Sequence, residues 1–318
     1  MNIKSFLSLV EIRTKVASVI PFIIGTSYAL FKFDNFNLKN AVIMFLSMII
    51  FDMTTTAINN YMDYKKAIKK DGYGYENHNA IVNFNINPKT VRVTIYTMLV
   101  IAALLGILLV KNTDIIVLLL GVVSFIIGIL YSFGPIPISR TPFGEILSGL
   151  AMGFIITFIS VYIHVFELNI VELTLASNTL GISLNIKELV SIFIISIPAI
   201  MCISNIMLAN NICDIDEDIV NKRYTLPIYI GKENALKIFK ALYYIGFISI
   251  IIAVIFRVLP VISLFTLLAL KPVNNNIKTF MNLQTKKDTF VLAVKNFVAM
   301  NGIYVLTIII GVFIRLIK

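Results

Sequence analysis

Long apolar runs constrain the fold of this chain more than any other feature. Stretches rich in isoleucine, leucine and valine at 99–110, 115–131 and 303–314 approach or reach the roughly 17–25 residues that cross a hydrocarbon core. In lipid the backbone must satisfy its own hydrogen bonds, so a spanning segment is a helix or part of a closed barrel. The runs are continuous rather than alternating, which favours helices. The sequence therefore predicts an all-α, polytopic membrane protein.

The charged residues support this prediction. Only 14% of the 318 residues are charged, whereas a soluble domain carries about 25%. The net charge of +10 does not indicate nucleic-acid binding, because the Lys and Arg residues lie in short loops between apolar runs. The two cysteines, Cys202 and Cys213, form neither a metal-binding spacing nor a disulfide framework. We expect the lipid bilayer as surroundings, and neither nucleic acid nor an obligate protein as a partner.

The apolar runs predict nine transmembrane helices in a single domain, residues 1–318. The predicted spans lie at roughly 16–31, 40–60, 92–110, 114–131, 143–165, 188–212, 235–256, 258–270 and 296–314. The eighth is short, and a tilted or partly interfacial helix would also fit it. We expect the helices to surround a central cavity that opens to the cytoplasmic side.

The distribution of Lys and Arg predicts the orientation. With the N-terminus in the cytoplasm, the cytoplasmic segments hold 20 of the 27 basic residues. These segments are 1–15, 61–92, 132–142, 213–240 and 271–295. The bias follows the positive-inside rule and predicts a multi-pass protein of the plasma membrane. The longest loop on the other side, 166–187, suggests no function.

Two acidic motifs end the second and sixth predicted spans. The first contains Asn59, Asn60 and Asp63, with Asp71 further on, and the second contains Asn210, Asp214 and Asp218, followed by Lys222 and Arg223. Residues at i and i+4 share a helix face, so each motif forms a polar stripe. Because the motifs lie half a chain apart, they suggest two related halves, about 1–142 and 143–318, that face one cavity.

Clustered carboxylates at a membrane boundary are costly and indicate a function. Mg²⁺ removes the repulsion, since it binds one or two carboxylates together with substrate phosphates and water. Asp63, Asp71, Asp214 and Asp218 are therefore candidate Mg²⁺ ligands at a diphosphate site. Lys66, Lys222 and Arg223 are candidates to neutralise the remaining diphosphate oxygens. Asp216 and Glu217 lie off the stripe and fit a solvated loop, whereas Asp52, inside the second span, is a functional candidate without a visible partner.

A third feature is Tyr131, which precedes a Gly-Pro-Ile-Pro stretch at the end of the fourth predicted span. The prolines end the helix there. An aromatic face beside a diphosphate leaving group stabilises allylic cation character. A tyrosine at the membrane interface explains the same residue equally well.

The two acidic motifs resemble those of the UbiA superfamily of intramembrane prenyltransferases. Asn59 and Asp63 match its first motif, Asn-Asp-x-x-Asp, and Asp214 and Asp218 match its second, Asp-x-x-x-Asp. Within the superfamily the chain is most similar to the 1,4-dihydroxy-2-naphthoate polyprenyltransferases of menaquinone synthesis. The stretches that carry this likeness are Arg13-Thr-Lys15, 59–64, 210–231 and 293–296.

The resemblance implies Mg²⁺-dependent transfer of a polyprenyl group from a polyprenyl diphosphate to an aromatic acceptor. For the naphthoate acceptor, loss of CO₂ would give a demethylmenaquinone. The resemblance implies catalytic roles for Asp63, Asp214, Asp218 and Tyr131, and substrate binding by Asn59, Asn60, Lys66, Asn210, Lys222 and Arg223. Arg13 or Lys15 would hold the acceptor carboxylate. Three positions depart from the family pattern: Asn60, where many members have Asp; Asp71, which comes later than the third acidic position usually does; and Cys213, where related sequences often have Arg.

Two other functions remain compatible with the sequence. A prenyltransferase of the same superfamily would act on 4-hydroxybenzoate, homogentisate, haem or a lipid glycerol. A cation-coupled secondary transporter would also keep Asp and Asn residues within its spans. The position of the acidic residues argues against a transporter, because its ion sites lie near the bilayer midplane rather than at span ends beside Lys and Arg.

Overall fold

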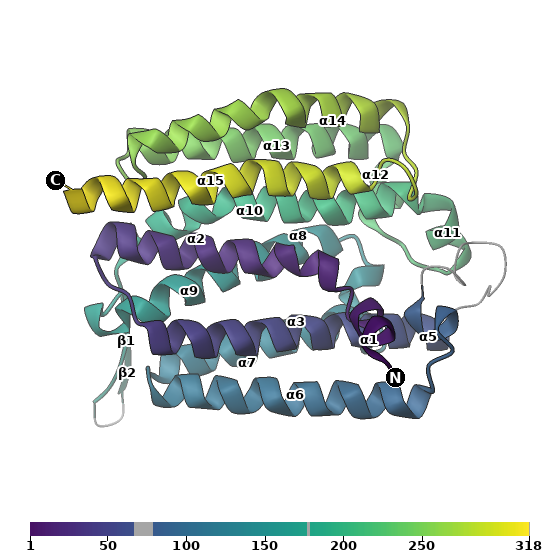
Figure 1. Ribbon diagram of the computed structural model, residues 1–318, viewed down its shortest axis with the longest axis horizontal. Helices are drawn as coiled ribbons and strands as arrows, with labels where there is room; N and C mark the ends of the chain where they lie inside the picture. The colour runs from purple at the N-terminus through teal and green to yellow at the C-terminus, as the bar shows by residue number, and fades with distance from the viewer. Residues whose placement is uncertain (67–78, 177–178, 318) are drawn as a thin grey trace.

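The computed structural model describes residues 1–66, 79–176 and 179–317 and shows a bundle of long helices packed side by side (Figure 1). The long helices are α2 (Val16–Phe33), α3 (Leu38–Lys66), α6 (Pro88–Lys111), α7 (Ile115–Ser132), α10 (Ile186–Cys213), α13 (Lys232–Ile255) and α15 (Val291–Ile317). One further rod consists of α8 (Gly144–Ser148), the π-helix η3 (Gly149–Ile155) and α9 (Ile156–Val165). Within the described residues, eight helices are long and apolar enough to cross a membrane. The predicted all-α, polytopic architecture is confirmed.

Short helices lie at the two ends of the bundle. They are α1 (Ile3–Leu9), η1 (Ile12–Lys15), α5 (Ala80–Asn83), η2 (Ile138–Arg140), η4 (Phe166–Leu168), α11 (Ile215–Val220) and α12 (Leu226–Ile230). Helices α3, α7 and α10 finish at one end, where α1, α5 and α11 also lie, on the right of Figure 1. We call this the motif end, because both acidic motifs are there.

The predicted span at 258–270 has different bounds in the structure. A 3₁₀-helix, η5 (Val261–Ala269), continues directly into α14 (Leu270–Asn282), and the rod runs beside α13 and α15 (Figure 1). Residues 271–282 were expected to be a loop. They are polar on the outer side of α14, which ends the apolar run, but Val273, Ile277 and Phe280 are buried at helical spacing against the bundle. The count of nine membrane crossings stays a prediction.

The segment 166–187 contains a β-hairpin, which the all-α prediction missed. Strands β1 (Val171–Ala176) and β2 (Thr179–Leu184) pair antiparallel at the end opposite the motif end. Apolar and polar residues alternate along both strands, and this period of two is the pattern of a half-exposed strand rather than of a helix.

Helix packing in the centre of the bundle depends on small residues. A Cβ atom built on Gly25 of α2 would lie 2.5 Å from the Thr157 carbonyl oxygen of α9. A Cβ atom built on Gly153 of η3 would lie 2.6 Å from the backbone of Ile200 in α10. Small residues let membrane helices approach closely, so these glycines set the distance of the η3–α9 rod from α2 and from α10, which carries the second motif.

We expect Gly153→Leu to destabilise the bundle. The added side chain meets the α10 backbone, and overpacking of this kind costs about 1–3 kcal/mol. The measurement is the temperature at which the detergent-solubilised protein loses its monodisperse elution peak. Gly302→Leu is the matched control, because a Cβ atom at Gly302 has nothing within 4 Å. Equal thermal stability of the two variants would contradict this account of the packing.

Candidate active site

The second acidic motif bridges the end of α10 and the short helix α11. The Asp214 amide donates to the Asn210 carbonyl oxygen at 3.1 Å, and the Asp218 amide donates to the Asp214 carbonyl oxygen at 2.7 Å. Helical hydrogen bonding therefore continues through the junction, and it keeps the three side chains on one side of the chain. Asp214 and Asp218 emerge at the motif end, where α10 gives way to α11 (Figure 1).

Asp218 is held by the loop that follows its own helix. Its side chain is 3% exposed, and its Oδ1 lies 3.3 Å from Arg223 Nε. The Thr225 hydroxyl donates to Oδ2 at 3.2 Å. Burial raises the pKa of Asp218 to about 6, against the opposing effect of Arg223. Burial by itself would lower the pKa of Arg223, but the carboxylates of Asp218, Asp63 and Asp214 outweigh it and the pKa is raised.

Arg223 brings the two motifs together. It interacts electrostatically with Asp63 of the first motif as well as with Asp214 and Asp218 of the second. Arg140, in η2, is likewise within electrostatic range of Asp63, Asp218 and Arg223. The Arg140 carbonyl oxygen accepts the Tyr224 amide at 3.2 Å, which joins the two loops. Carboxylates from distant parts of the chain thus surround one pair of arginines.

The environment of Arg140 is distinct from that of Arg223. Burial lowers the pKa of the Arg140 guanidinium, the neighbouring Arg223 lowers it further, and Asp63 and Asp218 oppose the shift. Two neighbouring arginines repel each other, so the carboxylates of Asp63 and Asp218 stabilise the pair. A bound diphosphate would add further negative charge beside them. Arg140 lies in the predicted cytoplasmic segment 132–142, but it was not predicted to be a site residue because it belongs to no motif.

Lys286 is a second residue that sequence reasoning did not place in the site. It lies between α14 and α15, and its ammonium donates to Asp214 Oδ2 at 2.5 Å and to Asn210 Oδ1. A cation from the last loop thus already contacts the oxygens of the second motif. The sequence offered no signal for this contact beyond a lysine in a basic loop.

The asparagines of the first motif face different neighbours. Asn59 Oδ1 accepts a hydrogen bond from the Ser132 hydroxyl, at the end of α7, at 3.1 Å. Asn60 is buried, and its amide donates to the Leu9 carbonyl oxygen and to Glu11 Oε1, both at 3.1 Å. The structure therefore places Asn60 in the contact between α3 and the α1–η1 segment, beside Leu9 and Glu11, rather than with the carboxylates around Arg223. Successive helix residues point in different directions, which separates Asn60 from Asn59.

Lys15 lies deeper in the bundle than the acidic motifs. Its ammonium donates to Asp52 Oδ1 and the Thr56 hydroxyl, both at 2.6 Å, and to the Asp52 carbonyl oxygen at 3.2 Å. The Ser18 hydroxyl donates to Asp52 Oδ2 at 2.6 Å. These contacts supply the partner of Asp52 that the sequence did not show. Asp52 lies eleven residues before Asp63, or about 16 Å along α3.

We use the name charged cluster for Asp63, Arg140, Asp214, Asp218, Arg223 and Lys286. Other predicted site residues lie apart from the charged cluster or outside the described residues. Arg13 is exposed in η1, and Lys222 is exposed with a positive φ of 53°. Asp216 is exposed on α11. Asp71 and the side chain of Lys66 lie outside the described residues.

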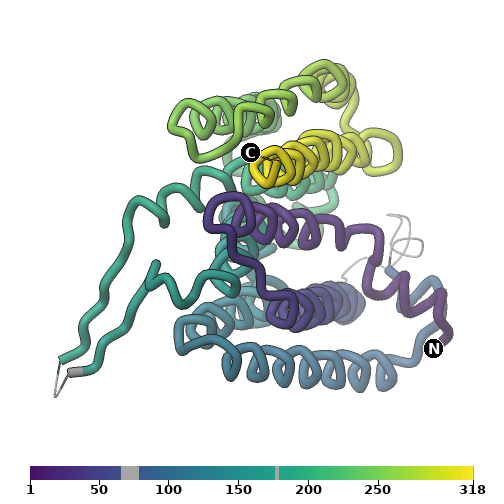
Figure 2. Tube along the Cα trace, turned by 60° about the vertical axis from the view of Figure 1, so that its left-hand side comes forward, coloured from purple at the N-terminus to yellow at the C-terminus, as the bar shows by residue number. Residues whose placement is uncertain are grey.

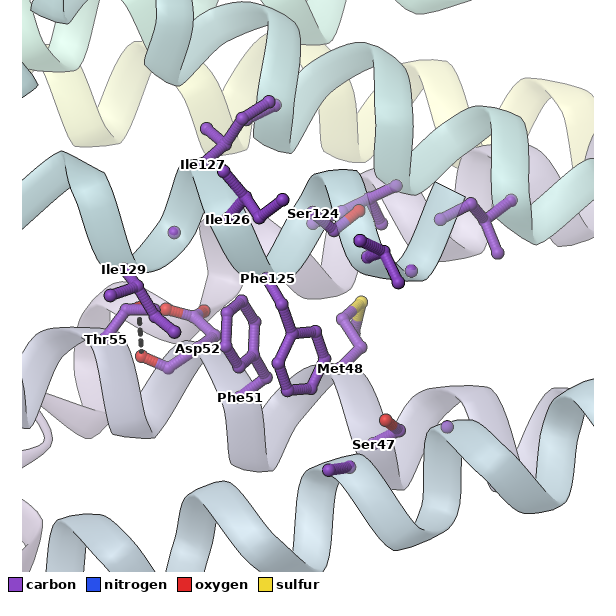
Figure 3. A pocket seen from close by; sticks show the side chains of 18 of the residues that line it. Ser47, Met48, Phe51, Asp52, Thr55, Ser124, Phe125, Ile126, Ile127 and Ile129 are labelled. Atoms are coloured by element: carbon purple, nitrogen blue, oxygen red, sulfur yellow. Dashed lines mark hydrogen bonds between the residues drawn. The ribbon is translucent and has the colours of Figure 1, made fainter. Parts of the chain in front are cut away.

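An elongated apolar cavity leads away from the charged cluster. It has a volume of about 640 Å³ and lies between α3, α6, α7 and the η3–α9 rod. Phe51 and Phe125 stack inside it at 4.1 Å between ring centroids, and Figure 3 shows the two rings beside Asp52 and Thr55. Tyr131 lines one end, and Arg223 is within electrostatic range of its hydroxyl group. One end of the apolar cavity therefore meets the charged cluster.

Comparison with known proteins identifies the family. A sequence profile of the UbiA prenyltransferase family matches residues 18–312. A 1,4-dihydroxy-2-naphthoate octaprenyltransferase of Bacillus subtilis (strain 168) is 30% identical over 246 residues, which cover 75% of this chain and 70% of the relative.

Solved structures show the same fold. The apo UbiA homologue of Aeropyrum pernix K1 has a TM-score of 0.67 at 16% identity, covering 93% of this chain and 98% of that one. The Archaeoglobus fulgidus UbiA homologue bound to GPP and Mg²⁺ has a TM-score of 0.64 at 17% identity, covering 97% and 99%. The chain therefore belongs to the UbiA prenyltransferase family and is a multi-pass membrane enzyme that transfers prenyl groups.

Proposed function

We propose that this enzyme transfers a polyprenyl group from a polyprenyl diphosphate to 1,4-dihydroxy-2-naphthoate, with loss of the carboxylate as CO₂. The observation that carries the proposal is the meeting of Asp63, Asp214 and Asp218 around Arg223, beside the Tyr131 end of an apolar cavity. The Bacillus relative, whose name specifies this naphthoate, supports the choice of acceptor. Another acceptor of the UbiA family is the alternative.

The acidic residues suit Mg²⁺ that arrives with the diphosphate. Among the described residues, no three Asp, Glu, His or Cys side chains form a metal site on their own. Mg²⁺ commonly takes only one or two carboxylates and fills its remaining positions with phosphate oxygens and water. Asp214, Asp218 and Asp63 would supply those carboxylates, with Asp71 as a further candidate. Bound Mg²⁺ would neutralise charge on the departing diphosphate.

The basic residues around the carboxylates have a separate task in this proposal. Arg223 and Arg140 would donate to diphosphate oxygens, where the fork of a guanidinium fits two oxygens at once. Lys286 contacts Asp214 and Asn210, and it would turn to the diphosphate when Asp214 binds the metal. Asn59 and Lys222 stay candidates for outer contacts.

The apolar cavity would hold the polyprenyl chain. Its walls are mainly apolar side chains, so the hydrophobic effect would hold the polyprenyl group there. The same walls would exclude water from the reacting carbon. Tyr131 would face the allylic carbon and stabilise its positive charge. The C–O bond breaks as the diphosphate leaves with the electron pair, the ring forms the C–C bond, and loss of CO₂ restores the aromatic ring. The product is the quinol form of a demethylmenaquinone.

The acceptor would enter between the charged cluster and the cavity. All three donors of Lys15 already have acceptors on Asp52 and Thr56, so holding the naphthoate carboxylate would require that pair to open. Arg13 is exposed in η1, so it would hold the naphthoate carboxylate without opening the Lys15–Asp52 pair. We keep the motif end in the cytoplasm of a plasma-membrane protein, as the positive-inside bias indicates.

The acceptor can be tested with the enzyme in proteoliposomes. We expect radiolabel from a polyprenyl diphosphate to move to 1,4-dihydroxy-2-naphthoate, with one labelled CO₂ released per transfer from carboxyl-labelled acceptor, and only when Mg²⁺ is present. 4-Hydroxybenzoate and homogentisate are the comparison acceptors. Transfer to either of these, with none to the naphthoate, would refute the acceptor while leaving the prenyltransferase assignment intact.

The carboxylates can be tested by matched substitutions on α11 and its flanks. We expect Asp214→Asn to lower kcat/KM by about 10²–10³, the usual cost of removing one electrostatic stabiliser. Asp216→Asn is the control, because Asp216 is exposed and should keep activity within about twofold. Single-turnover rates with saturating Mg²⁺ separate the chemical step from metal binding. Equal activity of the two variants would refute the site.

Lys286 offers a test of the diphosphate contact. We expect Lys286→Gln to raise the KM for the polyprenyl diphosphate by about 10–100-fold, because a hydrogen bond to a charged group contributes roughly 1.5–3 kcal/mol. Its neighbour Lys287 is exposed, so Lys287→Gln is a control with the same change of charge. An unchanged KM for Lys286→Gln would show that Lys286 serves only Asp214.

A further inference from the structure

The β-hairpin at the end opposite the motif end has two different faces. In the register of β1 and β2, Val171 pairs with Leu184, Leu173 with Ile182 and Leu175 with Leu180. Paired residues of an antiparallel ladder share a face, so these six apolar side chains form one surface, which we call the apolar hairpin face. The other face carries Glu172, Thr174, Thr179 and Ser183.

The root of the apolar hairpin face is covered by the helix bundle. Val171 and Leu173 pack against the main hydrophobic core, and the Val171 carbonyl oxygen accepts a hydrogen bond from the Tyr162 hydroxyl at 3.3 Å. The apolar hairpin face therefore turns towards the bundle, and the polar face turns away from it.

The outer part of the same face has no protein cover. Leu175 is 85% exposed, Leu180 64% and Ile182 62%. Contact of these large apolar side chains with water is unfavourable, because transfer of apolar surface out of water is the main driving force for burial. Three neighbouring large apolar side chains on one face form a patch of the kind that marks a contact with protein or lipid.

The connections of the hairpin fix its level in the membrane. β1 follows η4 at the end of the η3–α9 rod, and β2 leads through Asn185 into α10. In Figure 1 the hairpin runs across the direction of the helix axes, and in Figure 2 it projects sideways beyond the bundle. If the long helices stand upright in a bilayer, a hairpin in this direction lies along the membrane surface, at the ends of the η3–α9 rod and α10.

The first turns of α10, which follow the hairpin directly, also expose apolar side chains. Ile186, Val190 and Phe193 are exposed at i, i+4 and i+7, which is one stripe of the helix. On a membrane-spanning helix such a stripe faces lipid. The strands contain no Lys or Arg, so attraction to anionic head groups is not what would hold the hairpin there.

We propose that the hairpin is an interfacial anchor whose apolar face rests in the lipid surface of the leaflet opposite the motif end. Leu175, Leu180 and Ile182 insert among the upper acyl chains, and Glu172, Thr174 and Ser183 face water. Insertion of this kind depends on buried apolar area, so it proceeds on zwitterionic lipid. The hairpin would hold the ends of α9 and α10 at a fixed depth.

The absence of tryptophan from the sequence makes the test direct. Leu180→Trp on the apolar face and Ser183→Trp on the polar face each give a single-tryptophan protein. In phosphatidylcholine proteoliposomes with brominated acyl chains, we expect blue-shifted emission from Leu180→Trp and at least about twofold stronger quenching than from Ser183→Trp. Ile182→Trp repeats the measurement if Leu180→Trp is poorly folded, as judged by its elution profile.

Two results would overturn the proposal. Water-like, unquenched emission from both Leu180→Trp and Ile182→Trp would mean that the face stays in solvent. Blue-shifted emission that brominated lipid does not quench, and that shifts to the red when the protein is diluted in the vesicles, would mean that a second copy covers it. Neither result depends on prenyl transfer, so the test is independent of the proposed function.

Discussion

The electrostatic interaction of Arg223 with the carboxylates of both acidic motifs is the one on which the arrangement of the candidate site depends. A buried arginine or carboxylate alone loses its hydration, and removing one partner of such a pair usually costs several kcal/mol. Asp218 is almost fully buried, and Arg223 lies next to it while also interacting with Asp63 and Asp214. The loops that carry these residues must therefore stay together at the motif end. The same arrangement leaves a positively charged centre bordered by oxygen ligands, which is what a diphosphate with Mg²⁺ requires.

The bundle holds the charged cluster by two different means. Glycines such as Gly153 bring the η3–α9 rod against α10, so that packing fixes the second motif. The first motif is fixed from α3, which Lys15 and Asp52 tie to the start of α2 inside the bundle, and from α1, which contacts Asn60. The apolar cavity lies between these two supports along α7. In the proposed function this arrangement would separate the polyprenyl chain from its diphosphate, with Tyr131 at the end of the cavity between them.

Most of the helices could be predicted from the sequence because lipid demands long apolar runs, and Asp63, Asp214 and Asp218 stand out because charge at a span end needs a reason. The remaining features follow from tertiary contacts. Arg140 and Lys286 are single bases in loops, and only the fold brings them to the acidic residues. Asn60 belongs to a motif in sequence but faces α1 in space. The polar outer side of α14 ended the predicted span early. The hairpin was missed although the alternation of apolar and polar residues along both strands is visible in the sequence.

The departure at Cys213 has a physical counterpart elsewhere in the structure. Many family members carry Arg at this position, and a neutral thiol cannot supply that charge. Lys286 lies within electrostatic range of Cys213. Its ammonium contacts Asp214 and Asn210, which are one and three residues from Cys213 along the chain. A cation therefore stands next to the second motif, contributed by the α14–α15 loop instead of by α10. A lysine side chain on a loop changes partners more freely than an arginine on a rigid helix. In the proposed function, Asp214 would release Lys286 when a divalent ion and a diphosphate bind.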